Sequence, residues 1–90
     1  MKADMAKDRE LESNIAQAKD YIARHEAIKA KYPNAKTWEE LSEDDVEELS
    51  ELIIRGEEFL AYALKRKKIP VEFANRLDEL LEWNDSLGYA

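Results

Sequence analysis

The stretch SEDDVEELSELIIRGEEFLAYALKRKK, residues 42–68, contains the strongest fold signal in this chain. Its apolar side chains recur every three or four residues, which is the spacing of one face of an α-helix. Ser42 precedes the pattern as a helix cap, and Asp45 completes a variant capping box three residues later. The stretch therefore predicts a long helix over about residues 43–68. Its expected core positions are Val46, Leu49, Ile53, Gly56, Leu60 and Ala63, with Leu52, Phe59 and Leu64 at the edges.

The same periodicity predicts a helix before this stretch, over residues 11–32. Pro33 ends it, because proline disfavours helical geometry in the residue that precedes it. The expected core positions of this helix are Leu11, Ile15, Ala18, Ile22, His25, Lys29 and Tyr32, widened by Tyr21 and Ile28.

A third helix is predicted over residues 71–87. Pro70 suits its start, and Gly88 suits a left-handed C-cap against which Tyr89 packs back on the last turn. The expected core positions of this helix are Phe73, Ala74, Leu77, Leu80, Leu81 and Leu87.

Long helices joined by short connections favour an all-α, antiparallel up-down-up three-helix bundle. Between the first two helices, Thr37 and Glu40 form a capping-box pattern that predicts a short extra helical turn over about residues 38–41. We interpret residues 1–90 as a single helical domain in which residues 1–10 are frayed or project. The third helix is the shortest, so we expect a partner or a second copy where it leaves the other two uncovered.

Three residues have two interpretations each. Gly56 is expected to let a neighbouring helix approach closely, with a kink in its own helix as the alternative. Trp38 and Trp83 lie at the margins of the apolar faces, where we expect them to cover the core, with exposed anchors for a partner as the alternative.

The composition narrows the chemistry that the chain can carry. It contains no cysteine, so disulfides and thiolate chemistry are excluded. The single histidine, His25, has no second ligand at metal-binding spacing, and its apolar surroundings favour a packed, hydrogen-bonded core residue over a catalytic base or a pH-sensitive contact. The glycines lie too far apart for a phosphate-binding loop. We therefore expect no catalytic residue, no metal and no cofactor, and we interpret the protein as non-enzymatic.

The location of the protein is also an expectation from the sequence. Residues 1–10 lack the apolar segment of a signal peptide. The longest apolar run, FLAYAL at residues 59–64, is far shorter than a membrane span. We expect a cytoplasmic protein without a membrane partner.

Charge is distributed very unevenly. The formal net charge is −7, and residues 32–51 hold eight acids against the single base Lys36. Such a balance argues against direct binding to nucleic acid or to anionic membranes. The basic run KRKK, residues 65–68, stands at the end of a predicted helix, where the helix dipole favours cations; a contact with a partner or another subunit is the alternative. The sequence thus predicts a protein partner with a basic surface.

The acids of the predicted second helix fall into two groups, those in its first turn and those further along. The helix dipole favours those in the first turn, but its effect does not reach Glu47, Glu48 or Glu51. Like charges four residues apart on a helix repel each other, so these acids are a local cost. We predict that they dock on a basic, nucleic-acid-binding surface of a partner, with a merely solubilising face as the alternative. The predicted partner-binding residues are Asp44, Glu47, Glu48, Glu51, Ile54, Glu58 and Tyr62.

In size and acidity the chain resembles the small acidic helical inhibitors made by phages and mobile elements, including DNA mimics and anti-CRISPR proteins. The resemblance rests on size and charge and includes no shared motif; it implies an inhibitor that occupies a nucleic-acid-binding surface. The alternative function is a self-assembling structural or regulatory bundle, for instance a homodimer, whose acidic face only solubilises it. Its contacts would come from exposed aromatic side chains and from a strip of small residues on the first helix, for which the high helix propensity of alanine is the other explanation. The strip consists of Ala16, Ala23, Ala27 and Ala30.

Overall fold

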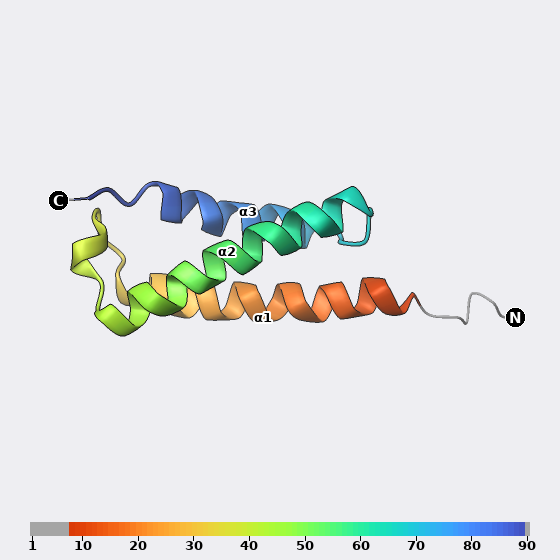
Figure 1. Ribbon diagram of the computed structural model, residues 1–90, viewed down its shortest axis with the longest axis horizontal. Helices are drawn as coiled ribbons and strands as arrows, with labels where there is room; N and C mark the ends of the chain where they lie inside the picture. Colours follow the sequence, from red (N-terminus) through yellow and green to blue (C-terminus); the bar gives the residue numbers. More distant parts are fainter. Residues whose placement is uncertain (1–7, 90) are drawn as a thin grey trace, which may run out of the picture.

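The computed structural model describes residues 8–89, which contain three α-helices and one short 3-10 turn. The chain runs along the first helix, returns along the second and runs back along the third (Figure 1), so the predicted up-down-up three-helix bundle is confirmed. The predicted extra turn between the first two helices is also present. The elements are α1 (Arg9–Lys31), η2 (Trp38–Glu40), α2 (Glu43–Lys65) and α3 (Val71–Asp85).

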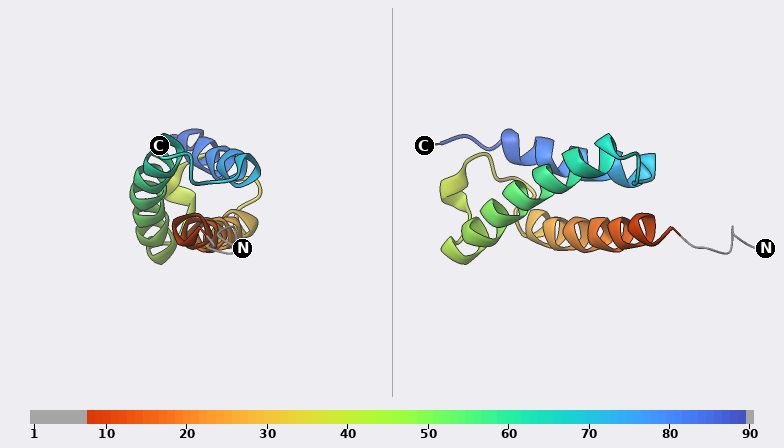
Figure 2. Two further views of the ribbon diagram at one scale, coloured as in Figure 1. Left: turned by 90° about the vertical axis from the view of Figure 1, so that its right-hand side faces the viewer. Right: turned by 45° about the vertical axis from the view of Figure 1, so that its right-hand side comes forward.

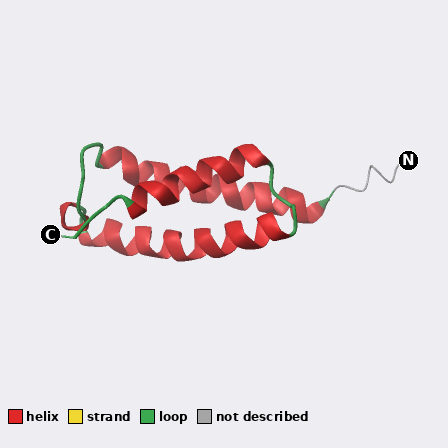
Figure 3. Ribbon diagram, turned by 90° about the horizontal axis from the view of Figure 1, so that it is seen from above, coloured by secondary structure: helices red, strands yellow, loops and turns green. Residues whose placement is uncertain are grey.

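The three helices surround one core. Seen end-on, they occupy the corners of a triangle (Figure 2), and each helix contacts both of the others. The connections lie at opposite ends of the bundle (Figure 3), because α1 and α2 are joined at one end and α2 and α3 at the other. The largest fully buried side chains are Leu49, Leu52, Leu77, Leu80 and His25.

Helix α1 begins two residues before the predicted start. The Asp8 carboxylate accepts a hydrogen bond from the backbone N–H of Leu11 at 3.0 Å and thereby caps the helix. Arg9 and Glu10 therefore belong to α1, although a frayed or projecting segment was expected there. Residues 1–7, for which the same expectation was made, lie outside the described residues.

The buried face of α1 is centred differently from the predicted one. Ala18 and His25 are fully buried as predicted, and Asn14 is buried although it was not expected to be. Because α1 contacts both α2 and α3, its buried face is centred between these two neighbours. The predicted core positions that are only half-buried are Leu11, Ile15, Ile22, Lys29 and Tyr32, whereas Tyr21 and Ile28, expected at the margins, are buried.

Helix α2 ends at Lys65, three residues earlier than predicted. Lys67 adopts a left-handed conformation with φ of 56°. Its N–H donates to the carbonyl of Leu64 at 3.0 Å, and the N–H of Lys68 donates to the carbonyl of Ala63 at 2.9 Å. These two bonds form a Schellman cap, whose left-handed position is normally glycine. The chain turns away at Lys67, so the basic run does not continue the helix.

The predicted left-handed cap at Gly88 is wrong. No glycine in the described residues has a positive φ. The Gly88 N–H donates to the Lys36 carbonyl at 2.8 Å, and the Gly88 carbonyl accepts from the Trp38 N–H at 2.9 Å. The chain after α3 thus pairs in an extended form with the segment before η2. As a result Leu87 is buried, while Tyr89 is 82% exposed instead of packing on the last turn.

Gly56 does not admit an unusually close neighbour, contrary to our expectation. It lies on the buried face of α2 towards α3. A Cβ atom built on it would lie 3.8 Å from Leu81 Cδ2 and 4.0 Å from Leu77 Cδ1, which are ordinary contact distances. Helix α2 also continues through this position without interruption. Neither a close approach nor a break in the helix requires glycine here.

Replacing Lys67 by glycine should raise the free energy of unfolding by about 0.5–1 kcal/mol, because glycine adopts the left-handed conformation without a steric cost. Urea denaturation measures the change. Lys65→Gly is the matched control, since it places glycine inside the last helical turn and should lower stability by up to about 1 kcal/mol. A loss of stability in Lys67→Gly would contradict the cap geometry.

Replacing Gly56 by alanine should stabilise the protein by about 0.5–1 kcal/mol, because alanine restricts the unfolded chain and its methyl group fits against Leu77 and Leu81. Thermal and urea denaturation both measure this. Gly56→Leu should do the opposite, since the longer side chain collides with the two leucines. If alanine also destabilises, α2 and α3 lie closer together than this structure has them.

Candidate functional site

The predicted partner-binding residues lie together on the side of α2 that points away from the core. All seven side chains are exposed, including the apolar Ile54 at 60% and the aromatic Tyr62 at 54%. The first five of them, from Asp44 to Ile54, line one shallow hollow on the surface of α2. Ile54 lines a second hollow as well, together with Glu58, Tyr62 and residues of α1. We call this set the outer face of α2: Asp44, Glu47, Glu48, Glu51, Ile54, Glu58 and Tyr62.

The acids of the outer face differ in whether a cation neutralises them. Glu48 lies 3.3 Å from the guanidinium of Arg24 on α1, and Glu51 lies 3.4 Å from Arg55 one turn further along α2. Both pairs are exposed and contribute little to stability. The carboxylates of the remaining acids of the face have no ion pair or hydrogen bond to any residue between positions 8 and 89. These unpaired acids are Asp44, Glu47 and Glu58.

Tyr62 is held in place at the far end of this face. Its hydroxyl group donates to the carboxylate of Glu10 at 3.3 Å, and the guanidinium carbon of Arg66 lies 5.5 Å from its ring centroid. Arg66 also forms an ion pair with Glu10, and this pairing lowers the pKa of the Glu10 carboxyl. The basic run at the end of α2 therefore binds the start of α1, in addition to any effect of the helix dipole.

A hollow with an aromatic lining lies beside the N-terminal end of the outer face. Trp38 and Tyr89 contribute its aromatic rings, and the outer-face acids Asp44 and Glu47 form part of its rim. The extended pairing of the C-terminal tail with residues 36–38 is what brings Tyr89 here from the other end of the sequence. The other lining residues are Glu39, Leu41, Glu43, Val46 and Ser50.

Asp45 does not complete the predicted capping box, because the Ser42 N–H donates to the Tyr32 hydroxyl at 3.1 Å; its carboxylate has a different structural role. It is only 9% exposed, and its carboxylate accepts hydrogen bonds from the Lys31 ammonium at 3.0 Å and the Tyr32 hydroxyl at 2.6 Å. These bonds, first that of Tyr32 and then that of Lys31, lower the pKa of the Asp45 carboxyl. Asp45 thus joins the end of α1 to the start of α2. Its position four residues before Leu49, on the buried face, was the sequence signal that distinguishes it from its acidic neighbours.

Two predicted caps in the acidic stretch are confirmed. One carboxylate oxygen of Glu40 accepts from the backbone N–H groups of Lys36 at 2.9 Å and Thr37 at 3.0 Å, and these bonds lower the pKa of the Glu40 carboxyl. Ser42 caps α2, because its hydroxyl oxygen accepts from the Asp45 N–H at 3.2 Å. Glu40 and Asp45 are therefore acids that build the fold and are separate from the outer face.

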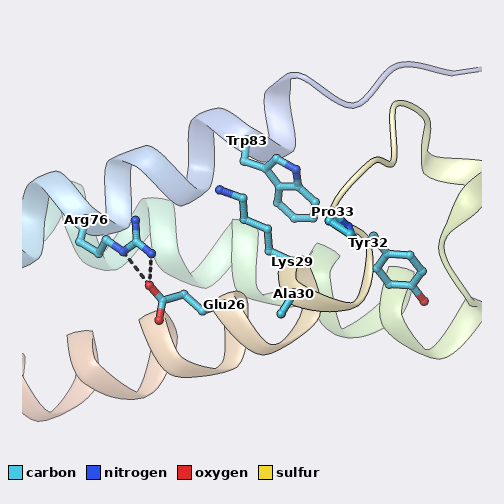
Figure 4. A pocket seen from close by; sticks show the side chains of 7 residues that line it. All are labelled: Glu26, Lys29, Ala30, Tyr32, Pro33, Arg76 and Trp83. Atoms are coloured by element: carbon cyan, nitrogen blue, oxygen red, sulfur yellow. Dashed lines mark hydrogen bonds and ion pairs between the residues drawn. The ribbon is translucent and has the colours of Figure 1, made fainter.

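Another hollow lies between α1 and α3, around Trp83 (Figure 4). Trp83 is half-buried against the core, and the Lys29 ammonium lies 6.0 Å from its ring centroid. Arg76 forms ion pairs with Glu26 across the two helices and with Glu79 on its own helix. Its charge is thus already neutralised within the fold. Trp38 is half-buried against the core as well, so both tryptophans cover the core while leaving part of the ring exposed.

His25 is a packed core residue, as predicted. Its side chain is fully buried, with Nε2 at 2.6 Å from Nδ2 of Asn84 and its ring edge-to-face with Trp83. His25 Nδ1 and Asn84 Oδ1 have no hydrogen-bond partner in the described part of the chain. Burial lowers the pKa of His25, the hydrogen bond from Asn84 opposes this, and the nearby charge of Lys29 adds to the lowering. The imidazole is therefore neutral in the folded protein near pH 7.

Among residues 8–89, no group of three or more His, Cys, Asp or Glu side chains is arranged to hold a metal ion. In the same part of the chain, no helix is long and apolar enough to cross a membrane. No protein-family model, curated protein or solved structure matches the chain. Any functional interpretation therefore depends on the surface chemistry of the bundle itself.

The buried His25 should make stability fall as the pH drops from about 7.5 to about 5.5. In this window the unfolded chain takes up a proton near pH 6.5 while the folded chain resists it, so acid favours unfolding by at most about 1.4 kcal/mol per pH unit. The carboxyls with lowered pKa, including those of Glu10, Glu40 and Asp45, act only at lower pH. Urea denaturation at several pH values measures the slope. His25→Gln, which cannot ionise, should remove it, and an unchanged slope in that variant would contradict the role of His25.

Proposed function

We propose that the protein is a non-enzymatic interaction module that docks the outer face of α2 on a basic surface of a partner protein. The observation that supports this most strongly is the row of exposed carboxylates on α2, three of which have no cationic partner within residues 8–89: Asp44, Glu47 and Glu58. A cationic partner surface would supply the charges that the fold itself does not.

Like-charge repulsion along α2 adds to this argument. Because α2 begins at Glu43, the repulsive pairs four residues apart are Glu43 with Glu47, Asp44 with Glu48, and Glu47 with Glu51. Each costs a few tenths of a kcal/mol, and Arg24 and Arg55 relieve only part of this cost. A basic surface would relieve the rest and would also attract the protein over a distance, which speeds association.

The partner surface that we propose is one that binds nucleic acid. From Asp44 to Glu58 the outer face extends over about 21 Å of helix, a length along which one DNA strand carries about six phosphates. Carboxylates on a rigid helix are suited to occupy the sites of such phosphates. The hollow between Trp38 and Tyr89 offers aromatic rings beside Asp44 and Glu47, where an arginine or lysine side chain can combine a cation–π contact with an ion pair. In this proposal the protein competes with nucleic acid for its partner, as DNA-mimic inhibitors do.

Self-assembly is the second candidate function, and one observation favours it. The strip of small residues on α1 is exposed along its whole length, as a contact surface for another copy would be in the monomer; it consists of Ala16, Ala23, Ala27 and Ala30. The two functions differ in the mass that they predict. Light scattering at high protein concentration should give a monomer if docking through α2 is the function, and a larger species if self-assembly is.

The docking proposal is tested with the full chain as an immobilised bait and the triple variant Asp44→Asn, Glu47→Gln, Glu58→Gln. Each substitution removes one negative charge at an exposed site, so the net charge changes from −7 to −4. A partner bound by the wild type should be lost from this variant, and should be released by raised salt and by duplex DNA.

The matched control is the variant Glu72→Gln, Glu82→Gln, Asp85→Asn, which removes three exposed, unpaired acids of α3, has the same net charge and leaves the outer face unaltered. It should retain the partner. Equal retention by both variants would show that the outer face is not the docking site. Failure of duplex DNA to release the partner would contradict a nucleic-acid-binding surface as the target.

A further inference from the structure

A groove with an apolar floor and acidic walls runs between α2 and α3. Its floor consists of Leu60, Ala61 and Leu64 from α2 and Leu81 from α3, and it encloses about 300 Å³. Figure 1 shows the C-terminal half of α2 beside α3, where the groove lies. Leu60 and Leu81 are nearly buried, whereas Leu64 is 50% exposed. Ala61 is exposed as well, so Leu64 and Ala61 are the part of the floor that no segment of residues 8–89 covers.

Four carboxylates form the walls of this groove, and no lysine or arginine lines it. Glu57 belongs to α2, while Asp78, Glu82 and Asp85 belong to α3. All four side chains are exposed, and none has an ion pair or hydrogen bond to another residue between positions 8 and 89. This differs from the hollow around Trp83, where Arg76 is neutralised by Glu26 and Glu79.

The arrangement of these residues follows from the two helices. On α2 the lining residues are 57, 60, 61 and 64, and on α3 they are 78, 81, 82 and 85. Both sets have the spacing i, i+3, i+4, i+7, so each occupies one side of its helix. Helices α2 and α3 pack against each other beneath the floor, where the Leu81 side chain faces Gly56. Two facing helix ridges with a leucine floor form the type of groove that accepts a third helix.

We propose that this groove binds an amphipathic, basic helix of a partner protein. The apolar ridge of that helix would cover Leu64 and the rest of the floor, while its lysine or arginine side chains pair with the carboxylates on both walls. A second copy of this chain is a poor occupant, because each copy carries a net charge of −7. The groove is only about two helical turns long, so we expect a weak, transient complex. It lies apart from the outer face of α2, and the inference stands whether or not that face docks elsewhere.

A synthetic peptide of about 15 residues tests the groove, with leucines at i, i+3, i+4 and i+7 and lysines on the opposite side. Backbone amide shifts of the isotope-labelled full chain report the binding site and the Kd. The largest shifts should map to the α2 and α3 residues that line the groove. A scrambled peptide of identical composition should bind at least about tenfold more weakly, because it cannot present one apolar ridge.

Paired variants separate this groove from the outer face. The substitutions Asp78→Asn, Glu82→Gln and Asp85→Asn together should weaken peptide binding about tenfold, and Leu64→Gln alone should also weaken it. The matched controls, Asp44→Asn with Glu47→Gln and Glu58→Gln, and Ile54→Gln alone, should leave the Kd within about twofold. All of the substituted side chains are exposed, so we expect every variant to fold. Thermal melting of each variant checks this.

Three results would overturn the proposal: equal binding of the scrambled peptide, an equal loss of binding in the outer-face controls, or a dimer of the chain that buries this groove. None of them bears on the capture experiment above, because that experiment depends on Asp44, Glu47 and Glu58. Conversely, if the outer face of α2 proves not to bind a partner, the result expected from the peptide experiment stays the same.

Discussion

The leucine face of α2 has to be covered from two sides at once, and the rest of the bundle is arranged around this requirement. Leu49 and Leu52 are completely buried, and the fully buried leucines of α3, Leu77 and Leu80, complete the same core. Each such side chain contributes about 1.5–3 kcal/mol by its removal from water. Within residues 8–89, α1 and α3 are the only helices that can cover α2. The opposite side of α2 therefore stays in water, and it is free to carry charge.

Burial on this scale also means that polar side chains at the margin of the core need hydrogen-bond partners within the protein. Asp45 lies on the buried side of α2, and its carboxylate is held by Lys31 and Tyr32. The amide of Asn14 donates to the carbonyl of Lys68 at 2.9 Å and so ties α1 to the turn after α2. In the described part of the chain, only His25 and Asn84 keep buried side-chain atoms without a hydrogen-bond partner. A buried group without a partner destabilises the fold, and burial also lowers the pKa of His25 because it disfavours the charged imidazolium.

The acidic stretch between Thr37 and Glu51 contains acids of three kinds. Glu40 and Asp45 are bound by backbone and side-chain donors and help to build the fold. Glu48 and Glu51 lie beside arginines, which neutralise them in part. Among the described residues, the free charge of the stretch lies on Glu43, Asp44 and Glu47, and it continues along α2 in Glu58. On the side towards α3, a second group of unpaired carboxylates surrounds an exposed leucine. Helix α2 thus contributes to two acidic surfaces. The outer face is shallow and mainly carboxylate, whereas the groove towards α3 has an apolar floor.

The sequence by itself determined the three helices, their direction, the caps at Thr37 and Ser42 and the exposure of the outer face. These follow from local properties, namely the period of the apolar residues, the capping patterns and the proline positions. Only the tertiary structure decided the features that depend on distant segments: the left-handed Lys67, the pairing of Gly88 with Lys36 and the groove formed by α2 and α3. The exposure of Leu64 is an example, since periodicity places it at the edge of the apolar face, but the position of α3 decides whether that edge is covered. Contacts between residues far apart in the chain depend on how the helices pack, and a periodic pattern contains no information about which of its margins a neighbour will reach.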